Sequence, residues 1–344
     1  MSTFQVRICD EHDQQRWETF VDLHKDCTSY HRWPWQHVFH DVFGWKAIYL
    51  MAERNGEVCG ILPLIWQKCW WHSYLSSMPH LQGGGIVANS DAIAHALVDS
   101  AIEMTQTLNA SYLELRHATP HDLPLLKRQD KVAAWLAVEP DVDQRLRQLD
   151  KKTRNLVRKS LSFGMTVEFG REELLENFYD VYRRNMHDLG SPCYSRAFFS
   201  HILRCFPAHA HLCVVRQAEQ SVAAAFLLGF RTTLEVAWAS ALRKFLSMKP
   251  NMFLYWNILA FAAERGYQIL DFGRSSRDSG SYAFKLQWGA IPQELPWSYW
   301  LNGAMSAPAT HSSGMQLASR LWQLMPDRLT DLLGPTLVEH IPGI

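Results

Sequence analysis

The chain has 344 residues and a mass of 39.7 kDa, which suits two domains of about 150 residues each better than one small domain. Apolar residues make up 47% of the chain, including 14 Trp and 17 Phe, and this excludes a mainly disordered protein. Lys and Arg together number 34, as do Asp and Glu. Because the net charge is zero, a polyanion could bind only at a local cluster of basic residues.

The cysteine pattern and the hydropathy both favour a cytoplasmic protein. The 7 cysteines are scattered and form no C-x-x-C pair, which is typical of reduced, buried thiols. The first residues lack the basic and apolar regions of a signal peptide. The longest apolar runs, such as Val222 to Phe230, reach about half of the roughly 20 residues that a membrane helix needs. We therefore expect a cytoplasmic protein without an integral membrane segment.

The first part of the chain, residues 1–140, predicts a mixed α/β domain. Pro34 is well placed to begin a short helix that ends before Gly44, and Asn55-Gly56 is a strong signal for a tight hairpin. The expected strands are Phe4 to Ile8, Ala47 to Glu53, Val58 to Trp66, Tyr112 to Arg116 and Val132 to Val138, and the other expected helices are Glu11 to His24 and Asp91 to Leu108.

Residues 164–302 repeat the same order of elements, namely two helices, three successive strands, a buried helix and one more strand. We interpret this repeat as an architectural duplication. The buried helix is apolar nearly all round. The expected helices are Glu172 to Leu189, Ser195 to Phe206 and Pro250 to Arg265, and the expected strands are His211 to Arg216, Ser221 to Phe230, Thr233 to Ser240 and Ile269 to Phe272.

Between the two halves, residues 141–163 predict one basic connecting helix. From Arg145 to Lys159 there are seven basic residues against a single acidic one. Lys151, Arg154 and Arg158 are spaced i, i+3 and i+7, so they share one helical face. Such a face is either simply solvated or used to bind phosphate, and both interpretations stay open at this stage.

The familiar catalytic and metal-binding motifs are absent from the sequence. None of the close histidine pairs has a recognised metal-ligand spacing with a cysteine or carboxylate partner, so we expect no metal site. Cys193 is more readily a packed thiol than a nucleophile, since no base can be assigned to it. Gly83-Gly84-Gly85 precedes a capped helix and fits either an anion-binding loop or close backbone packing.

The segment DFGRSSRDSGSYAFKLQWG, residues 271–289, is the richest candidate for a functional site. It follows a short buried strand, where loops commonly carry site residues. The alternative is a polar turn followed by an amphipathic core helix. Its polar candidates, close to apolar Phe284 and Trp288, are Arg274, Ser275, Ser279, Tyr282 and Lys285.

These residues resemble the FemAB family of the GNAT acyltransferase superfamily, especially the FemAB-like proteins associated with PEP-CTERM and exosortase exopolysaccharide systems. The matching segments are KKTRNLVRKS, NMHDLGSPCYSRAFFSHILRCFP, NMFLYWNILAFAAERG, DFGRSSRDSGSYAFKLQWGA and the closing LASRLWQLMPDRLTDLLGPTLVEHIP. The resemblance implies two tandem GNAT-like α/β domains with mixed sheets, residues 1–140 and 164–302. Residues 141–163 would connect them, and residues 303–344 would form a C-terminal helical tail.

The same resemblance implies an enzyme that transfers an acyl or aminoacyl group to an amine of an envelope- or exopolysaccharide-related acceptor. Such an acceptor is a small molecule or a glycan or peptide precursor. FemAB proteins proper use aminoacyl-tRNA, and some carry a coiled-coil arm for it. No heptad arm occurs in this sequence, so acyl-CoA stands beside aminoacyl-tRNA as the expected donor. Two other hypotheses are a non-catalytic module that binds a nucleotide-sugar or lipid-linked precursor, and a direct tRNA binder.

In the GNAT arrangement the donor carbonyl lies against a splayed strand pair, and each candidate residue then takes a role. Lys285 is expected near the developing negative charge or the donor phosphate, with Tyr282 and Arg274 orienting the substrate. Asn251 starts the buried helix, whose N–H groups would point at donor phosphate. Further substrate or phosphate contacts are expected from Ser275 and Trp288 and, facing a cleft between the domains, from Lys151, Arg154 and Arg158.

Overall fold

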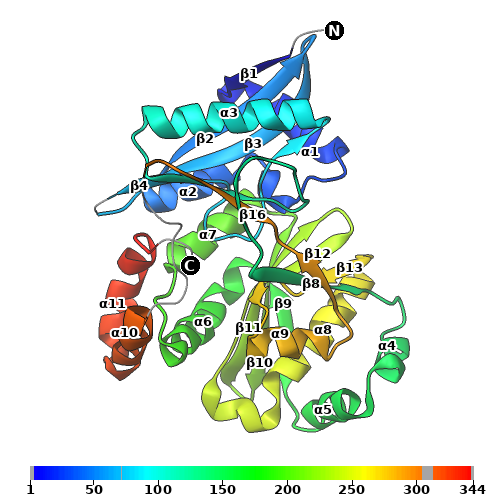
Figure 1. Cartoon of the computed structure of the whole chain (residues 1–344). Coiled ribbons are helices and arrows are strands. Elements are labelled where there is room, and N and C mark those ends of the chain that lie inside the picture. Colours follow the sequence, from blue (N-terminus) through cyan, green and yellow to red (C-terminus); the bar gives the residue numbers. More distant parts are fainter. Residues whose placement is uncertain (1–3, 71, 304–312, 342–344) are drawn as a thin grey trace. The chain divides into compact units, whose positions relative to one another are not determined.

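The computed structural model describes residues 4–70, 72–303 and 313–341. Contacts divide the chain into two compact units. Unit 1 combines Met1–Lys131 with Glu294–Thr310 and Glu339–Ile344, and unit 2 combines Val132–Gln293 with His311–Val338. Each unit is built on one mixed sheet (Figure 1). Within the described ranges, no helix has both the length and the apolar character of a membrane span.

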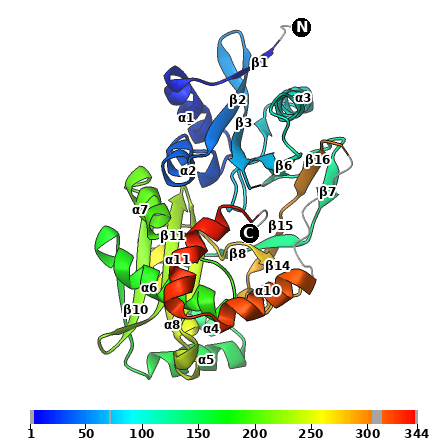
Figure 2. The ribbon, with the colours of Figure 1, turned by 90° about the vertical axis from the view of Figure 1, so that its left-hand side faces the viewer.

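The sheet of unit 1 has helices on both faces. Its strand order is β1-β2-β3-β4-β6-β16-β7, and β5 pairs with β3. The helices α1 and α2 lie on one side of β2 and β3, and α3 lies on the other (Figure 2). The elements are β1 (Gln5–Ile8), α1 (Gln14–Leu23), α2 (Trp35–Phe43), β2 (Lys46–Arg54), β3 (Glu57–Lys68), β4 (Ser73–Ser76), β5 (Val87–Ala88), α3 (Asp91–Thr107), β6 (Tyr112–Arg116), β7 (Leu126–Arg128) and β16 (Trp297–Leu301).

The sheet of unit 2 is arranged in the same way, with strand order β14-β8-β13-β12-β11-β10-β9 and β15 paired to β8. Helix α6 packs on β11 from one side and α8 from the other (Figure 1). The elements are β8 (Lys131–Ala137), α4 (Val142–Gln148), α5 (Lys151–Leu161), β9 (Thr166–Gly170), α6 (Leu175–Leu189), α7 (Arg196–Cys205), β10 (Ala210–Gln217), β11 (Gln220–Phe230), β12 (Thr233–Ala241), α8 (Pro250–Glu264), β13 (Ile269–Asp271), β14 (Ser275–Ser276), α9 (Gly280–Leu286), β15 (Ile291–Glu294), α10 (Ser313–Leu324) and α11 (Asp327–Val338).

Among the described residues, four short 3₁₀ helices complete the secondary structure. They precede or follow longer elements and bring polar groups to helix starts. Thr28, for example, caps one of them by accepting a hydrogen bond from the Tyr30 N–H. Their bounds are Glu11–Asp13 for η1, Ser29–His31 for η2, Glu172–Leu174 for η3 and Arg243–Met248 for η4.

The duplication inferred from the sequence is confirmed by the topology of the two sheets. In each sheet, four antiparallel strands are followed by a parallel pair, β4 with β6 in unit 1 and β12 with β13 in unit 2. The next strand is antiparallel in both sheets. This sixth strand is exchanged between the halves of the sequence: β16 joins the unit 1 sheet, whereas β8, expected to close the first half, joins the unit 2 sheet.

The structure confirms two local predictions, the tight hairpin at Asn55-Gly56 and the helix end at Gly44. Asn55 and Gly56 join β2 to β3 with φ of 54° and 81°, the positive values that a type I′ hairpin turn requires at both positions. Helix α2 ends at Gly44, whose φ of 66° closes the helix in the left-handed conformation.

The connecting segment contains two helices, and the prediction of one continuous helix is wrong. Helix α4 ends before Leu149, which is extended, with ψ of 146°. Asp150 then caps α5, because its Oδ1 accepts the backbone N–H groups of Lys152 at 2.8 Å and Thr153 at 3.0 Å. A side chain that satisfies two N–H groups at a helix start stabilises a new N-terminus there, so the chain breaks its helix at this position.

The glycine run that precedes α3 packs against unit 1 side chains and is buried. A Cβ on Gly85 would lie 2.6 Å from Nδ1 of His117, and one on Gly84 would lie 2.4 Å from the Met78 side chain. Burial lowers the pKa of His117 to about 3, so its imidazole stays neutral. Of the two interpretations, close backbone packing is the one that the structure shows.

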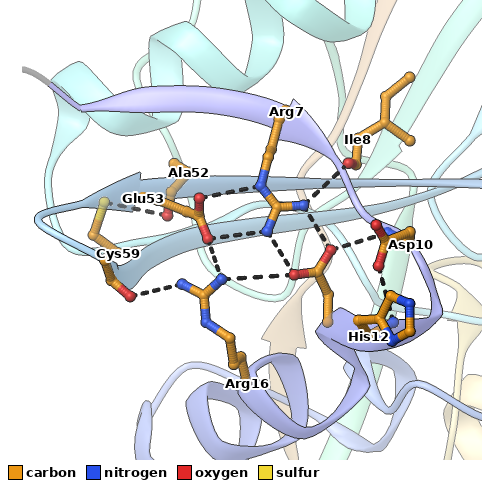
Figure 3. A network of polar contacts seen from close by, with 10 residues as sticks. Arg7, Ile8, Asp10, His12, Arg16, Ala52, Glu53 and Cys59 are labelled. Carbon is orange, nitrogen blue, oxygen red and sulfur yellow. Dashed lines mark hydrogen bonds and ion pairs between the residues drawn. The ribbon is translucent and has the colours of Figure 1, made fainter.

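An ion-pair network fixes the edge strand β1 to the rest of unit 1 (Figure 3). The Arg7 guanidinium donates to both oxygens of Asp13, at 2.6 and 2.5 Å, and to Glu53 on β2 at 3.1 Å. Arg16 on α1 contacts Glu53 at 2.5 Å. Asp13 is only 7% exposed, and hydrogen bonding to Arg7 is the main reason that its pKa falls to about 2.

We predict that Asp13→Asn removes a pH-dependent part of the stability of unit 1. A carboxyl whose native pKa lies below its ordinary value of 3.8 stabilises the fold above that value, and this contribution is lost as the pH falls towards 2. The size of the shift corresponds to about 2 kcal/mol at neutral pH. Urea unfolding at several pH values checks this. The exposed Asp99→Asn serves as the control, and equal acid sensitivity of wild type and Asp13→Asn would contradict the prediction.

Candidate active site

The strand pair β12 and β13 separates at its C-terminal end, and the candidate residues gather there. The parallel pairing covers only three residues of each strand and ends at Glu235 opposite Asp271. Strand β12 continues to Ala241, whereas β13 stops. The register between β11 and β12 also shifts, because Phe226 faces Trp238 while Leu227 faces Val236. Ala237 is therefore an extra residue of β12, a bulge beside the point of separation.

Lys285 on α9 reaches this point with its ammonium group. Its Nζ donates hydrogen bonds to the carbonyl oxygens of Gly273 at 2.7 Å and Arg274 at 3.0 Å. Gly273 has φ of +74°, and a Cβ there would lie 2.7 Å from the Val236 carbonyl, so the position requires glycine. The turn after β13 is thus held to β12 by close backbone approach and to α9 by a buried charge.

Two buried carboxyl groups accompany the Lys285 ammonium. Lys285, Asp271 and Glu235 are 6%, 4% and 7% exposed. Burial lowers the pKa of Lys285 to about 8, while the charges of Asp271 and Glu235 act in the opposite direction. The Asp271 carboxylate also accepts the Gly273 N–H at 2.8 Å. Near neutral pH the site consequently presents a charged donor that a small change of environment can deprotonate.

Serine hydroxyls order the loop between β13 and α9. Ser279 caps α9 by accepting the Tyr282 N–H at 3.2 Å, and its hydroxyl hydrogen-bonds to that of Ser281 at 2.9 Å. The Ser281 hydroxyl in turn lies 3.1 Å from that of Ser275, which is buried. Tyr282 and Arg274 are half-buried. The structure therefore brings Arg274, Ser275, Tyr282 and Lys285 into one loop-and-helix unit, as a short sequence separation suggests.

Trp288 takes a place in the core. Its side chain is 0% exposed and lies among Tyr255 of α8, Phe272 and Phe284. Tyr255 and Phe272 stack with ring centroids 5.1 Å apart. This aromatic cluster fixes α9 against α8, so Trp288 acts on the site through the position of Lys285 and presents no surface to a ligand in this structure.

The N-terminus of α8 forms a second part of the site and carries basic residues. Lys249 precedes the helix in the left-handed conformation, Pro250 is its first residue, and half-buried Asn251 follows. The preceding 3₁₀ helix η4 contains exposed Arg243 and Lys244. Pro is favoured at a first helical position because it lacks the N–H that would otherwise stay unpaired. Positive side chains at the positive end of a helix dipole suit a phosphate.

The three basic residues of the connecting segment belong to another surface of unit 2. Lys151 and Arg158 on α5 are exposed, and half-buried Arg154 donates to the Arg147 carbonyl at 3.2 Å. The opposite face of α5, with buried Thr153 and Val157, packs towards α8. Both α5 and the aromatic residues around α9 therefore pack on α8.

Sequence reasoning missed the two carboxyl groups beside Lys285. Both lie in otherwise apolar strands, Glu235 within TLEVAWASA and Asp271 at the end of ILD. A charged residue in a buried strand is costly unless it has a partner, and this was the signal that could have found them. Among the residues that the structure describes, no group of three or more His, Cys, Asp or Glu side chains could hold a metal ion.

We predict that Lys285 titrates near pH 8, well below its ordinary value of 10.5. NMR of methylated lysines, assigned by comparison with Lys285→Met, measures this pKa. Asp271→Asn should lower it further, because a neighbouring negative charge favours the ammonium form. A native pKa below the ordinary value also means that stability is lost as the pH falls from about 10.5 towards 8. Titration near 10.5 would contradict the environment described above.

Comparisons with known proteins concern unit 2 and the fold of the chain. The family model described as "Acetyltransferase (GNAT) domain" matches residues 143–286, which all lie in unit 2. No curated protein matches the chain. Among solved structures, FemX shares 16% identity with a TM-score of 0.67, and the match covers 87% of this chain and 97% of FemX.

Two further structures have the same fold. The C-terminal domain (DUF2156) of a putative lysylphosphatidylglycerol synthetase from Agrobacterium fabrum is 12% identical with a TM-score of 0.58, covering 96% of this chain and 98% of that one. A tandem GNAT protein from the clavulanic acid biosynthesis pathway is 10% identical with a TM-score of 0.58, covering 89% and 100%. Residues 143–286 thus match an acetyltransferase (GNAT) domain, and the two sheets of one topology give the whole chain a tandem GNAT fold similar to the folds of FemX and of the clavulanic acid pathway protein.

Proposed function

We propose that unit 2 transfers an acyl or aminoacyl group from an activated donor to an amine, by direct attack and without a covalent enzyme intermediate. The observation that carries the proposal is the buried ammonium of Lys285 at the end of the β12–β13 pair, inside the segment that matches the GNAT domain. A preorganised cation in a water-poor site stabilises negative charge that develops on a reacting oxygen.

The donor is held at the start of α8. Its phosphate groups lie at the helix N-terminus, near Asn251, and are neutralised by Lys249 and the basic residues of η4. Acyl-CoA and aminoacyl-tRNA both carry phosphate beside an activated acyl group, so both fit this chemistry. The donor carbonyl lies where β12 and β13 separate, and a main-chain N–H freed by the bulge at Ala237 polarises it.

The reaction follows from this placement. The neutral acceptor amine attacks the polarised carbonyl carbon, a C–N bond forms, and the C–S or C–O bond to the donor breaks. The proton lost by the amine passes to water or a side-chain base, and the leaving thiolate or alkoxide takes up a proton. Lys285 stabilises the transient oxyanion or the donor phosphate, while Arg274, Tyr282 and Ser275 orient the substrates.

Unit 1 has the same topology but a different interior at the equivalent place. Its parallel pair ends at Ser76 opposite Glu114, and Arg116 donates to Glu114 at 2.6 Å and to the Leu81 carbonyl at 2.7 Å. The buried glycine run and His117 fill the space before α3. Helix α3 begins with Asp91, which disfavours phosphate. These features support assigning the transfer to unit 2 alone.

The acceptor is an amine on a small-molecule, glycan or peptide precursor, and we place its phosphate on the basic face of α5. The resemblance to FemAB-like proteins of exopolysaccharide systems supports an envelope-related acceptor. The named function of one structural neighbour, a lysylphosphatidylglycerol synthetase, supports aminoacyl transfer as one form of the chemistry. A tRNA donor predicts binding that weakens steeply with salt.

Purified protein incubated with labelled acetyl-CoA or aminoacyl-tRNA and a panel of amines tests the proposal. Formation of a labelled amide with either donor supports it. If a phosphorylated precursor binds but no labelled product forms with any donor, the chain is the non-catalytic binding module that the sequence also allowed.

We predict that Lys285→Met lowers the rate of transfer by about 10²–10³-fold, the usual effect of losing one preorganised donor to an oxyanion. Methionine keeps most of the apolar stem and removes the charge. Thermal unfolding verifies that the variant is folded, and Lys159→Met, which removes an exposed lysine of unit 2, is the matched control. Wild-type turnover in a folded Lys285→Met protein would exclude Lys285 from the site.

A second prediction concerns the basic face of α5. The combined variant Lys151→Ala, Arg154→Ala and Arg158→Ala should weaken a phosphorylated substrate by about 1–3 kcal/mol for each contact that is lost. Calorimetric titration measures this against Lys152→Ala, a change on the same helix outside the three-residue face. Unchanged affinity in the folded triple variant would show that this face is only solvated.

A further inference from the structure

The C-terminal helices α10 and α11 pack on α6 through their inner faces (Figures 1 and 2). On α10, Trp322 is buried. On α11, Thr330, Gly334 and Val338 are buried and recur every four residues, so they share one face. The backbone at Gly334 approaches Cys193, whose Sγ would lie 3.2 Å from an added Cβ. The inner side of the helical hairpin formed by α10 and α11 is therefore packed against the rest of unit 2.

The outer faces of the same helices are also apolar, which an ordinary surface helix is not. Leu317, Leu321 and Leu324 of α10 are spaced i, i+4 and i+7, opposite Trp322, and are 60%, 56% and 81% exposed. Leu329 and Leu332 of α11 lie opposite its buried face, Leu333 lies beside that face, and all three are exposed. We call these six leucines the outer leucine face.

Such a face is unusual, because a helix that is apolar on both sides is normally buried on both sides. Scattered exposed apolar residues need no explanation, but apolar residues concentrated on one element mark an interaction site. The remaining large exposed apolar residues of the described chain are spread over many elements. This concentration of exposed leucines therefore marks the outer leucine face as an interaction site.

The charges around the outer leucine face identify the kind of occupant. Both acidic residues of the hairpin contact basic residues of α6: Asp331 lies 2.5 Å from Arg183, and Asp327 lies 3.5 Å from His187. The hairpin's two arginines, Arg320 and Arg328, are exposed. Asp331 is thus paired with an arginine on the inner side, whereas Arg320 and Arg328 are exposed to solvent next to leucines.

We propose that the outer leucine face binds the surface of an anionic lipid bilayer. Leucines enter the boundary between headgroups and acyl chains, while Arg320 and Arg328 contact lipid phosphates, as in helices that lie in the plane of a membrane. The absence of a spanning helix from the described residues agrees with binding at the surface. This inference stands independently of the transfer reaction, because it uses neither α9 nor α5.

Sedimentation of the full chain with vesicles tests the inference. Vesicles of phosphatidylcholine with 30% phosphatidylglycerol are compared with vesicles of phosphatidylcholine alone, at low and physiological salt. We expect the anionic vesicles to bind the protein and the neutral ones to bind it much more weakly. Replacing Arg320 and Arg328 by Gln should cost about fivefold in binding for each arginine, as one basic residue near an anionic surface contributes about 1 kcal/mol.

A leucine variant separates lipid insertion from general charge attraction. Leu317→Gln, Leu321→Gln and Leu324→Gln together should abolish sedimentation with either vesicle and leave thermal unfolding unchanged, since these side chains are exposed. The matched control replaces Leu23, Leu126 and Leu161, which are 81%, 58% and 43% exposed, by Gln and should bind as the wild type does.

Three results would overturn the inference. The first is wild-type protein that binds neither kind of vesicle, and the second is a leucine variant that binds as well as its control. The third is a wild-type dimer in light scattering that the leucine variant converts to a monomer without any vesicle binding, which would make the face a contact between two copies of the chain.

Discussion

The arrangement of unit 2 depends on one buried charge, the ammonium of Lys285. An unpaired charge in a protein interior is costly, so the surrounding backbone must supply acceptors. Two carbonyls of the turn after β13 do so, and the nearby carboxyl groups of Asp271 and Glu235 oppose the loss of the proton. The same contacts fix how the β13 turn, α9 and the end of β12 lie relative to one another. The buried Lys285 ammonium therefore determines the local structure and is also the group on which the proposed chemistry depends.

The two units share one fold but differ in the buried polar groups at the end of the parallel strand pair. Both sheets have the same strand order and both parallel pairs end at a buried carboxyl group, Glu114 in unit 1 and Asp271 in unit 2. In unit 1 Arg116 pairs with Glu114, and the glycine run between β4 and α3 is packed with side chains. In unit 2 the charge of Asp271 acts on Lys285 of the short helix α9, and a basic segment precedes α8. The fold is conserved between the units while the functional groups differ.

Much of the fold could be predicted from the sequence because its signals are local. The Asn55-Gly56 hairpin, the glycine that ends α2 and the apolar α8 each follow from a few neighbouring residues. The exchange of β8 and β16 could not be predicted, since strand pairing depends on contacts far apart in the chain. Lys285 was found from its motif, whereas Glu235 is 50 residues away in sequence and is brought to it only by the parallel pairing. Trp288 was expected at a ligand, but its place was decided by packing on Tyr255.

Donor binding by unit 2 is tested most directly by hydrogen–deuterium exchange measured with and without donor. Saturating acetyl-CoA or aminoacyl-tRNA should slow exchange at residues 237–241 of β12 and 251–254 of α8. The corresponding segment of unit 1, residues 77–91, should be unaffected. Protection of residues 77–91 with none at the start of α8 would contradict the assignment and place the donor in the other unit.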